Sequence, residues 1–375
     1  MAVDLSTDQA YMKMALGLAR RGLGRTSPNP CVGAVVVKGG QVVGKGWHRR
    51  AGEPHAEINA LSAAGELARG GTIYVTLEPC NHHGRTPPCS KAILAAGISR
   101  VVYGMADPNP MAGGGGACLA GGGLEVVAGV LADDCRRLNL SFSKRVNTGR
   151  PWVLLKAAVS LDGRIATASG RSKWITGEQA RHLVHRLRDR NDAILVGSGT
   201  VLADDPSLTT RLPGGVGRDP LRVILDRHLT TPPAAKVVAH NSPAATWIFC
   251  GPEAEADKEQ RLQRPGVEIR RVGLEADGTL RLGEVLDQLG QAGITTLLVE
   301  GGGRVHGSFL RLELADEVAF FIAPLLIGGD GMAVVGELGL TDLGRAPRLH
   351  EIERRRCGED FLIRGLLRPL TGQGS

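Results

Sequence analysis

Apolar and polar positions alternate along the first half of the chain with two different periods. Apolar residues recur at helical spacing near the N-terminus and then, after a proline-containing break at residues 27–30, in two strand-like runs around a Gly-Gly turn. The pattern predicts helices over residues 8–21, 55–68, 90–96 and 131–146, and strands over residues 32–37, 42–47, 72–77 and 101–104. This order is typical of a central sheet with helices on its faces.

A second pattern of strands and helices follows a short polar segment at residues 147–151. It predicts a helix over residues 177–190 and strands over residues 152–159, 193–197, 223–226, 246–250, 296–299 and 318–322. The chain has 375 residues, more than one typical domain needs. We therefore expect two α/β domains, residues 1–147 and 148–375.

One segment of the first half does not follow the helix and strand pattern. Residues 113–123 contain seven glycines, and each glycine costs a helix about 1 kcal/mol relative to alanine. Glycine also loses more backbone entropy on ordering than other residues do. We therefore expect this segment not to form a stable helix and to be more mobile than its neighbours.

Composition and charge limit the classes of protein to consider. No apolar run is long enough to span a membrane, and the polar N-terminus lacks the apolar core of a secretory signal. Seven cysteines are few for a disulfide-stabilised protein of this length and fit a cytoplasmic chain better. The net charge of +7 suits either nucleic acid or small phosphorylated ligands, and the 3% aromatic content favours the small ligands.

The most informative residues for chemistry lie between positions 55 and 89. His55 and Glu57 form an H-x-E motif, and Pro79-Cys80 is followed by Cys89. One imidazole and two thiolates hold Zn²⁺ and leave its fourth position for water, whose pKa the metal lowers. Glu57 lies close enough in the chain to carry a proton from that water to a leaving amine. The motif therefore predicts a catalytic zinc site with His55, Cys80 and Cys89 as ligands and Glu57 as the proton carrier.

Two other interpretations of these residues remain open at this point. A structural zinc site would need a fourth ligand, and His82 or His83 in the loop between the cysteines could supply it. The histidine and the two cysteines could also be unrelated to one another. Asn29, His48 and His82 lie beside the predicted strand ends, as do Asp107 and Asn109, so we expect some of them to contact the substrate.

The second half contains weaker chemical signals. A glycine-rich turn, Gly301-Gly302-Gly303, follows a predicted strand and opens a helix, an arrangement that lets backbone N–H groups approach phosphate oxygens. It is not the G-x-G-x-x-G opening of a Rossmann domain, and it could simply connect a strand to a helix. Residues 200–211 form a polar segment after another strand and are predicted to be a loop.

The first half resembles the deaminase domain of the bifunctional riboflavin-biosynthesis enzymes, in which a pyrimidine deaminase is fused to a reductase. The resemblance is carried by four runs, of which the specific one is the long loop between the two cysteines. They are Pro28-Asn29-Pro30-Cys31-Val32-Gly33, Gly52-Glu53-Pro54-His55-Ala56-Glu57, Thr76-Leu77-Glu78-Pro79-Cys80 continuing to Cys89, and Asp107-Pro108-Asn109-Pro110. The resemblance implies a cytidine-deaminase-like three-layer fold.

The second half resembles the reductase domain of the same family, which is similar to dihydrofolate reductase. The matching runs are residues 156–163, 174–177, 200–211 and 300–303. The resemblance implies that NADPH is held by Ala158, Trp174, Thr200, Asp204, Gly302, Gly303, Arg304, Val305, His306, Gly307 and Ser308. It also implies that the phosphorylated substrate is held by Ser172, Arg188, Leu208, Arg211 and Glu300. Arg227 stands where the family commonly has serine.

Two ionisable residues are candidates for reductase chemistry. We expect Lys156 to handle charge at the reacting carbon and Asp204 to anchor the cofactor ribose or the sugar chain. The alternative is that Lys156 and Asp204 form an ion pair that only braces a strand end.

The sequence therefore predicts a zinc- and NADPH-dependent enzyme of riboflavin synthesis. It would deaminate 2,5-diamino-6-(5-phosphoribosylamino)pyrimidin-4(3H)-one and then reduce the ribosyl group to ribityl. We expect a cytoplasmic homo-oligomer that acts on a small phosphorylated pyrimidine and binds neither nucleic acid nor a membrane. The alternatives are a single-function nucleobase or nucleoside deaminase with a non-catalytic second domain, and an RNA-binding deaminase-like module.

Overall fold

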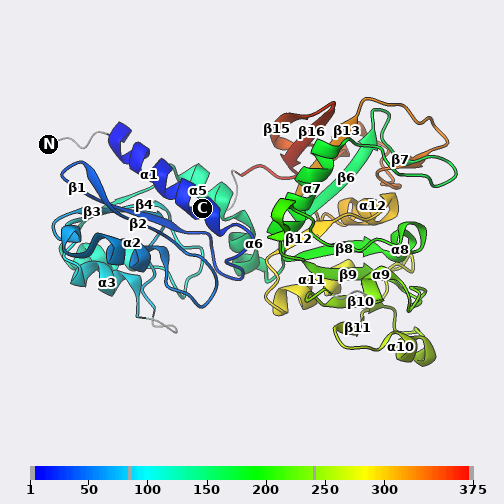
Figure 1. The fold of residues 1–375 in the computed structure, drawn as a ribbon, viewed down its shortest axis with the longest axis horizontal. Coiled ribbons are helices and arrows are strands. Elements are labelled where there is room, and N and C mark those ends of the chain that lie inside the picture. Colours follow the sequence, from blue (N-terminus) through cyan, green and yellow to red (C-terminus); the bar gives the residue numbers. More distant parts are fainter. Residues whose placement is uncertain (1–4, 83–86, 240–241, 371–375) are drawn as a thin grey trace. The chain divides into compact units, whose positions relative to one another are not determined.

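The computed structural model describes residues 5–82, 87–239 and 242–370. The chain divides into two compact units, Met1–Gly149 and Arg150–Ser375, which Figure 1 colours from blue to teal and from green to red. None of the described helices combines the length and the apolar character that a membrane span needs. Each unit has its own sheet and its own apolar core.

The first unit is built on a five-stranded sheet in the order β2-β1-β3-β4-β5. β1 pairs with β2 and β3 in antiparallel fashion, whereas the β3–β4 and β4–β5 pairs are parallel. The strands are β1 (Gly33–Lys38), β2 (Gln41–Trp47), β3 (Thr72–Leu77), β4 (Arg100–Met105) and β5 (Glu125–Ala128). Apolar runs such as Gly33–Lys38, buried at all but the last residue, form its centre.

Helices cover both faces of this sheet and make a three-layer unit. A Cβ at Gly33 of β1 would meet the backbone of α1 (Leu5–Ala19), and a Cβ at Gly104 of β4 would meet Cys135 of α5 (Ala132–Leu138). On the opposite face, Gly44 and Gly46 of β2 lie directly against α2 (Ala56–Ala64). The remaining helices are α3 (Cys89–Ala95), α4 (Gly115–Gly121), α6 (Leu140–Thr148) and the 3-10 turns η1 (Arg20–Gly22) and η2 (Gly65–Ala68).

Two of the predicted elements in the first unit are wrong. The expected helix over residues 131–146 is broken into α5 and α6, because Asn139 leaves helical geometry and its buried side chain bonds to both the N–H and the C=O of Cys31. The glycine-rich segment does contain a helix, α4. The N–H of Gly116 finds an acceptor in Glu78, and Gly115 allows close packing against the backbone of Pro79, so tertiary contacts outweigh the low helix propensity.

The second unit contains a nine-stranded sheet in the order β11-β10-β9-β8-β12-β6-β13-β16-β15. The strands from β11 to β13 run parallel, and β16 and β15 add an antiparallel edge. The strands are β6 (Trp152–Ser160), β8 (Ala193–Gly197), β9 (Leu221–Leu225), β10 (Thr246–Cys250), β11 (Val267–Arg271), β12 (Thr296–Val299), β13 (Glu317–Ala323), β15 (His350–Cys357) and β16 (Asp360–Leu366). A separate pair joins β7 (Arg164–Ala166) to β14 (Met332–Ala333).

Apolar residues alternate along the parallel strands and build one core on each face of the sheet. Helix α7 (Glu178–Arg190) contributes Ala180 and Val184 to one core, and α11 (Leu282–Gln291) contributes Val285 and Leu289 to the other. The other helices are α8 (Ser198–Asp204), α9 (Lys236–Ala239), α10 (Ala256–Leu262) and α12 (Gly303–Arg311), with 3-10 turns η3 (Pro213–Gly215) and η4 (Leu343–Arg345). The segment 200–211, predicted to be a loop throughout, begins inside α8, because Val201 packs into the core.

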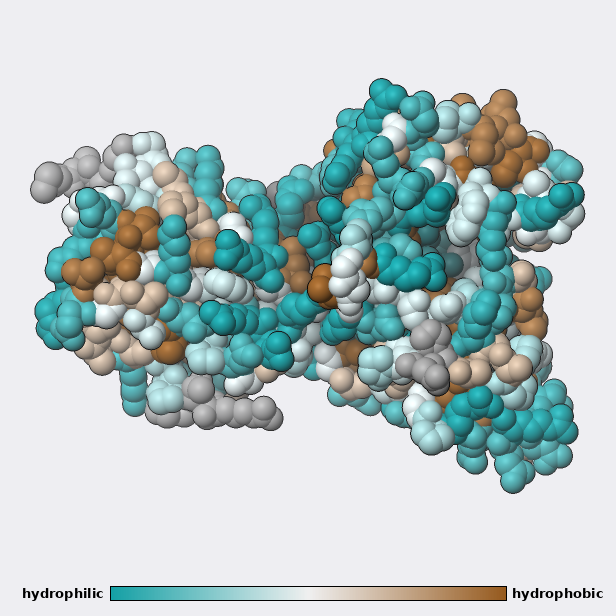
Figure 2. All heavy atoms as spheres, in the orientation of Figure 1, coloured by the Kyte–Doolittle hydropathy of each residue, from teal (hydrophilic) through white to brown (hydrophobic). Residues whose placement is uncertain are grey.

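On the face that Figure 2 shows, the surface of both units is largely hydrophilic, as its teal spheres indicate. Apolar side chains that reach the surface of the second unit include Leu161, Leu326 and Leu343. The largest fully buried side chains include Met12 and Leu16 in the first unit and Phe249, Phe309 and Phe321 in the second. Burial of such side chains supplies the main driving force for folding each unit.

Candidate functional sites

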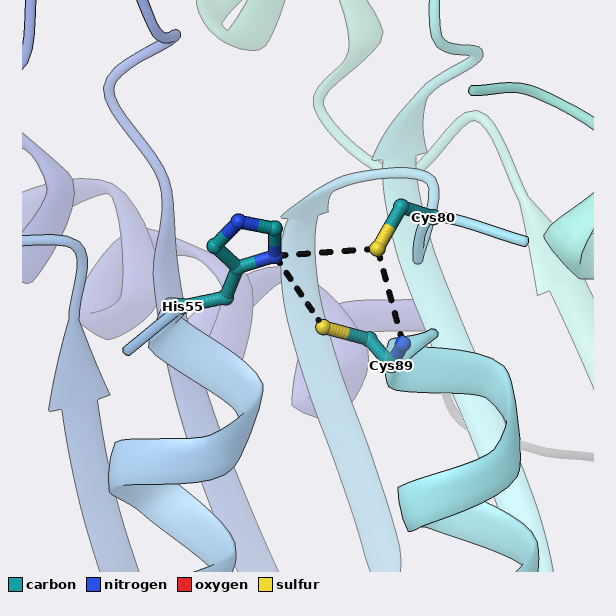
Figure 3. Close-up of side chains that lie close together, drawn as sticks. All are labelled: His55, Cys80 and Cys89. Carbon is teal, nitrogen blue, oxygen red and sulfur yellow. Dashed lines mark hydrogen bonds between the residues drawn. The ribbon is translucent and has the colours of Figure 1, made fainter. Parts of the chain in front are cut away.

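The first site is a cluster of His55, Cys80 and Cys89, whose ligand atoms lie within 4.8 Å of one another. His55 Nδ1 is 3.3 Å from Cys89 Sγ and 3.6 Å from Cys80 Sγ, and the backbone N–H of Cys89 donates to Cys80 Sγ (Figure 3). One imidazole nitrogen and two sulfurs at this spacing fit a zinc ion with a fourth position left for water. Among the described residues this is the only group of three or more His, Cys, Asp or Glu with metal-binding geometry.

Three element ends bring these ligands together. His55 is the extended residue just before α2, Cys80 follows β3 after Glu78-Pro79, and Cys89 is the first residue of α3. The N–H of Ser90 also donates to the carbonyl oxygen of Cys80, which ties the start of α3 to the end of β3. The two ends of the loop between the cysteines are thereby fixed relative to each other.

Hydrogen bonds within the cluster shift the pKa values of its members. A hydrogen bond from the Cys89 thiol lowers the pKa of Cys80 to about 4, and the same interaction raises the pKa of Cys89. The hydrogen bond to Cys80 raises the pKa of His55. A thiolate is therefore already favoured at Cys80, which is the form that binds a metal.

Glu57 is the second residue of α2, two positions after His55, and is only 4% exposed. Within the described part of the chain, its Oε2 has no hydrogen-bond partner. Burial raises the pKa of Glu57 above its ordinary value. A buried carboxyl group with one free oxygen beside a metal-binding cluster is suited to accept and release a proton.

A cavity of about 480 Å³ opens onto this cluster. Its lining includes the candidate residues Asn29, His48 and His82. Asn29 Nδ2 lies 3.0 Å from His48 Nε2, and His48 Nδ1 lies 3.2 Å from the carbonyl oxygen of Pro54. The lining also contains Pro28, Pro30, Val32, Ala51, Gly52, Glu53, His55, Glu57, Leu77, Glu78, Cys80, Asp107, Asn109, Ala112 and Phe142.

The sequence analysis missed Glu78 and Phe142 in this cavity. Glu78 directly precedes Pro79-Cys80, so its position in the motif was a usable signal, whereas Phe142 comes from α6 far along the chain. His82 is exposed in the ligand loop, and His83, the other candidate for a fourth ligand, lies outside the described residues.

The second site is a cavity of about 720 Å³ in the second unit. It brings together ten of the residues singled out in the second half of the sequence. They are Lys156, Ala158, Ser172, Trp174, Arg188, Thr200, Asp204, Arg211, Glu300 and Gly302. Several come from segments that follow the carboxyl ends of parallel strands, where ligands bind in open α/β sheets.

A buried charge cluster lies in this cavity. Glu300 accepts two hydrogen bonds from Arg188, at 2.8 and 2.9 Å, and its Oε2 lies 3.5 Å from Lys156 Nζ. Burial alone would raise the pKa of Glu300, but the two cations overcome it and hold that pKa well below its ordinary value. Burial lowers the pKa of Lys156, although Glu300 opposes the effect.

Asp204 is not the partner of Lys156. Asp204 accepts a hydrogen bond from Ser172 at 3.3 Å and lies 3.9 Å from the ammonium group of Lys173. The suggested ion pair between Lys156 and Asp204 is therefore wrong, because Glu300 occupies the position beside the lysine.

Basic residues of α7 that the sequence analysis missed also line the second cavity. Arg181 and His185 lie seven and three residues before Arg188, so the three share one face of α7. His185 Nδ1 accepts the N–H of Arg211, and burial together with Arg188 and Arg211 lowers the pKa of His185 to about 4. Helical spacing was a signal that could have identified this face.

The glycine-rich turn has two different environments. Gly302 lines the cavity, and a Cβ there would meet nothing within 4 Å. A Cβ at Gly303 would lie 2.2 Å from the carbonyl oxygen of Ala333, and Gly307 packs against Gly336. Gly303, Arg304, Val305, His306, Gly307 and Ser308 are not among the residues that line this cavity.

Three further candidates lie in other surroundings. His306 is fully buried, and its Nδ1 lies 3.0 Å from the carbonyl oxygen of Val334. Leu208 is buried in the core with a left-handed backbone and does not line the cavity. Arg227 donates to Glu253 and to the carbonyl oxygen of Gly278.

Comparisons with known families agree with this division of the chain. Residues 5–105 match the cytidine and deoxycytidylate deaminase zinc-binding region, and residues 151–363 match the RibD C-terminal domain. The riboflavin biosynthesis protein RibD of Bacillus amyloliquefaciens is 45% identical over 358 residues, which cover 95% of this chain and 95% of that protein. The protein of the same name from Escherichia coli is 44% identical and covers 95% of this chain and 98% of its own length.

A solved structure from Thermotoga maritima has the same two-part organisation. It is a diaminohydroxyphosphoribosylaminopyrimidine deaminase/5-amino-6-(5-phosphoribosylamino)uracil reductase, 40% identical, with a TM-score of 0.85 over 96% of this chain and 98% of that one. Fold and site together define a zinc-dependent deaminase joined to a reductase, with a cytidine-deaminase-like first half and a dihydrofolate-reductase-like second half. The chain belongs to the RibD family, the bifunctional deaminase/reductases of riboflavin biosynthesis. The predictions of family and fold class are confirmed.

Proposed function

We propose that the first unit deaminates 2,5-diamino-6-(5-phosphoribosylamino)pyrimidin-4(3H)-one and that the second unit reduces the ribosyl group of the product with NADPH. The observation that carries the deaminase assignment is the His55, Cys80 and Cys89 cluster beside the buried carboxyl group of Glu57. The reductase assignment is supported by a separate cavity that contains a buried Lys156–Glu300–Arg188 cluster. The functional domains are residues 1–147 and 148–375.

In the deaminase site, His55, Cys80 and Cys89 hold zinc. Zinc, when bound, lowers the pKa of a water molecule and so supplies a nucleophile near neutral pH. Glu57 takes a proton from the attacking water and gives it to the departing amine. Asn29, His48 and His82 contact the pyrimidine, because all three line the cavity in front of the cluster.

In the reductase site, Ala158, Trp174, Thr200, Asp204 and Gly302, which line the cavity, hold the cofactor. NADPH, when bound, supplies the hydride that reaches the sugar carbon. Ser172, Arg188, Arg211 and Glu300, which line the same cavity, hold the phosphorylated substrate. Lys156, whose side chain is 11% exposed beside Glu300, balances charge at the reacting carbon.

We further propose a cytoplasmic homo-oligomer. A cytoplasmic location would keep the thiols of Cys80 and Cys89 reduced, as zinc binding requires. Light scattering of the purified chain measures the number of copies directly.

The decisive experiment assays ammonia release and NADPH oxidation on the phosphoribosyl pyrimidine. The parent chain should carry out both steps. Glu57→Gln should retain zinc, lose deamination by about 10²–10⁴-fold and keep NADPH oxidation on the deaminated intermediate. Lys156→Met should have the opposite pattern, with normal ammonia release, normal NADPH binding and slow NADPH oxidation in a single turnover.

The outcomes separate the alternatives. Ammonia release without any NADPH oxidation would identify a single-function deaminase, and neither activity on this substrate would contradict the proposal. A Glu57→Gln variant with normal deamination would remove the assigned role of Glu57, whatever the reductase does.

A further inference from the structure

The peptide that carries Cys80 is held on both sides by one segment, residues 107–116, which lies after the next strand of the sheet. On the N-terminal side, the carboxylate of Glu78 accepts the N–H groups of Asp107 at 3.2 Å and Gly116 at 2.9 Å. On the C-terminal side, the N–H of Asn81 donates to the carbonyl oxygen of Ala112 at 3.0 Å. Glu78 and Asn81, which lie on either side of the metal ligand Cys80, are therefore both hydrogen-bonded to the segment 107–116.

The first residue of helix α4, Gly115, packs directly against the Pro79–Cys80 peptide. A Cβ built on Gly115 would lie 1.7 Å from the carbonyl oxygen of Pro79 and 2.8 Å from its carbonyl carbon. Real Cβ atoms do not approach backbone so closely, so any side chain at this position must displace either α4 or the peptide that leads into Cys80. Gly114 supplies the left-handed turn, at φ +86°, with which the helix begins.

We propose that Glu78 and Gly115 are positioning residues that set the zinc affinity of the deaminase site through the Cys80 peptide. This inference rests on the proposed zinc site. The glycine-rich segment thus has a specific use, because glycine lets the backbone of α4 approach the backbone of Pro79. The carboxylate of Glu78 also accepts the N–H of Gly116, which lies in the first turn of α4 and has no partner within the helix.

The chain offers a matched control within the same helix. Gly121 is the last residue of α4, is exposed, and a Cβ there would meet nothing within 4 Å. Gly115→Ala and Gly121→Ala therefore make the same chemical change at the two ends of one helix, but only the first collides with the Cys80 peptide.

The experiment measures zinc affinity in the full-length chain by competition with a chromophoric chelator, and records the absorption spectrum after substitution with Co²⁺. Altered support of a metal ligand typically weakens binding by about 10–100-fold, so Gly115→Ala should fall in this range and Gly121→Ala should match the parent. The thiolate–cobalt bands should change in Gly115→Ala alone, which a general loss of stability would not cause. Glu78→Gln should weaken zinc in the same direction, because its amide group presents N–H where the carboxylate accepted one.

The possible failures can be told apart. A parent chain that binds no zinc would contradict the proposed function itself. A parent that binds zinc, together with a folded Gly115→Ala whose affinity and cobalt spectrum equal those of Gly121→Ala, would overturn only the inference. If Gly115→Ala does not fold, Glu78→Gln decides: unchanged zinc affinity and an unchanged cobalt spectrum in that variant would also overturn it.

Discussion

Replacing Glu300 by glutamine tests whether the buried cluster of the second unit serves the reductase reaction or only the fold. The change keeps the shape of the side chain and removes its charge. It leaves Arg188 and Lys156, which both face Glu300 in the present geometry, without the carboxylate that neutralises them. Both cations are largely buried, with side chains 13% and 11% exposed, so water replaces the lost partner poorly.

The size of the effect follows from the geometry. At an effective dielectric constant of about 20, unit charges at the 3.5 Å separation of Lys156 Nζ and Glu300 Oε2 attract by about 4.7 kcal/mol. Measured losses on removing one partner of a buried pair are about 3–5 kcal/mol, which agrees with this figure. A domain of this size loses about 2–4 °C of melting temperature per kcal/mol, so we expect a decrease of about 6–20 °C.

The loss of stability alone does not separate the two roles, so the assay follows the reaction. Glu300 opposes the effect of burial on the pKa of Lys156, and without it that pKa falls further. Lys156 then loses its proton at a lower pH, and the single-turnover rate of NADPH oxidation should decline at a lower pH than in the parent. The measurement is made well below the melting temperature, with substrate and NADPH at saturation.

Glu317 is the matched control for this prediction. It is also buried, accepts Arg364 Nε at 2.5 Å and Trp152 Nε1 at 3.1 Å, and does not line the cavity. Glu317→Gln should lose stability but keep the rate and its pH dependence. If Glu300→Gln reduces substrate with the rate and pH profile of Glu317→Gln, the cluster around Glu300 is structural and its assigned place in the reaction is wrong.

Three further predictions follow from the division into units and from single buried groups. Chains cut after Gly149 should each fold and keep one half-reaction, deaminase or reductase, because each unit has its own core; two insoluble halves would contradict this. His185 takes up a proton near pH 6.5 when unfolded but only near pH 4 when folded, so the unfolded state binds more protons between these values and stability falls as the pH is lowered through them. Denaturant titrations of His185→Gln should therefore show a smaller loss of stability from pH 6.5 to pH 4 than the parent shows, and equal slopes would refute the assignment. The side chain of Asp8 is 2% exposed and accepts hydrogen bonds from both amino groups of Arg100 at 2.9 Å. Asp8→Asn should therefore lower the free energy of unfolding of the first unit by about 3–5 kcal/mol and leave NADPH oxidation unchanged. A loss below about 1 kcal/mol, which is typical of a surface ion pair, would show that this pair is not effectively buried.

The strands that sequence predicts best are those whose apolar runs are bounded by polar residues. Thr246–Cys250 and Thr296–Val299 have the predicted bounds, and every residue of the first is buried. The edge strand His350–Cys357 was missed because seven of its eight residues are exposed and most are charged, so it has no apolar face to recognise. It is a strand because its backbone pairs with β16, and its own sequence carries no signal of that pairing.

The two sites differ in how far the sequence alone defines them. In the deaminase site the ligands and the proton carrier sit at the ends of neighbouring elements, so the spacing of His55, Glu57, Cys80 and Cys89 carries most of the information. The reductase cavity collects residues from several separate segments between positions 156 and 302, and no spacing in the chain relates them. The partner of Lys156 was accordingly misjudged: Asp204 was considered, but Glu300 lies beside it.

Glycines show most clearly what sequence alone does not reveal, because the role of a glycine depends on which atoms a Cβ at its position would meet. In sequence, Gly302 and Gly303 are equivalent members of one phosphate-binding turn. In space, Gly302 faces the open cavity, whereas Gly303 leaves room for the backbone at Ala333. Gly115 likewise makes room for the Pro79–Cys80 peptide, in a segment that propensity alone predicts to be irregular. A run of glycines therefore does not show which of its members makes room for a ligand or for backbone, and only the fold decides that.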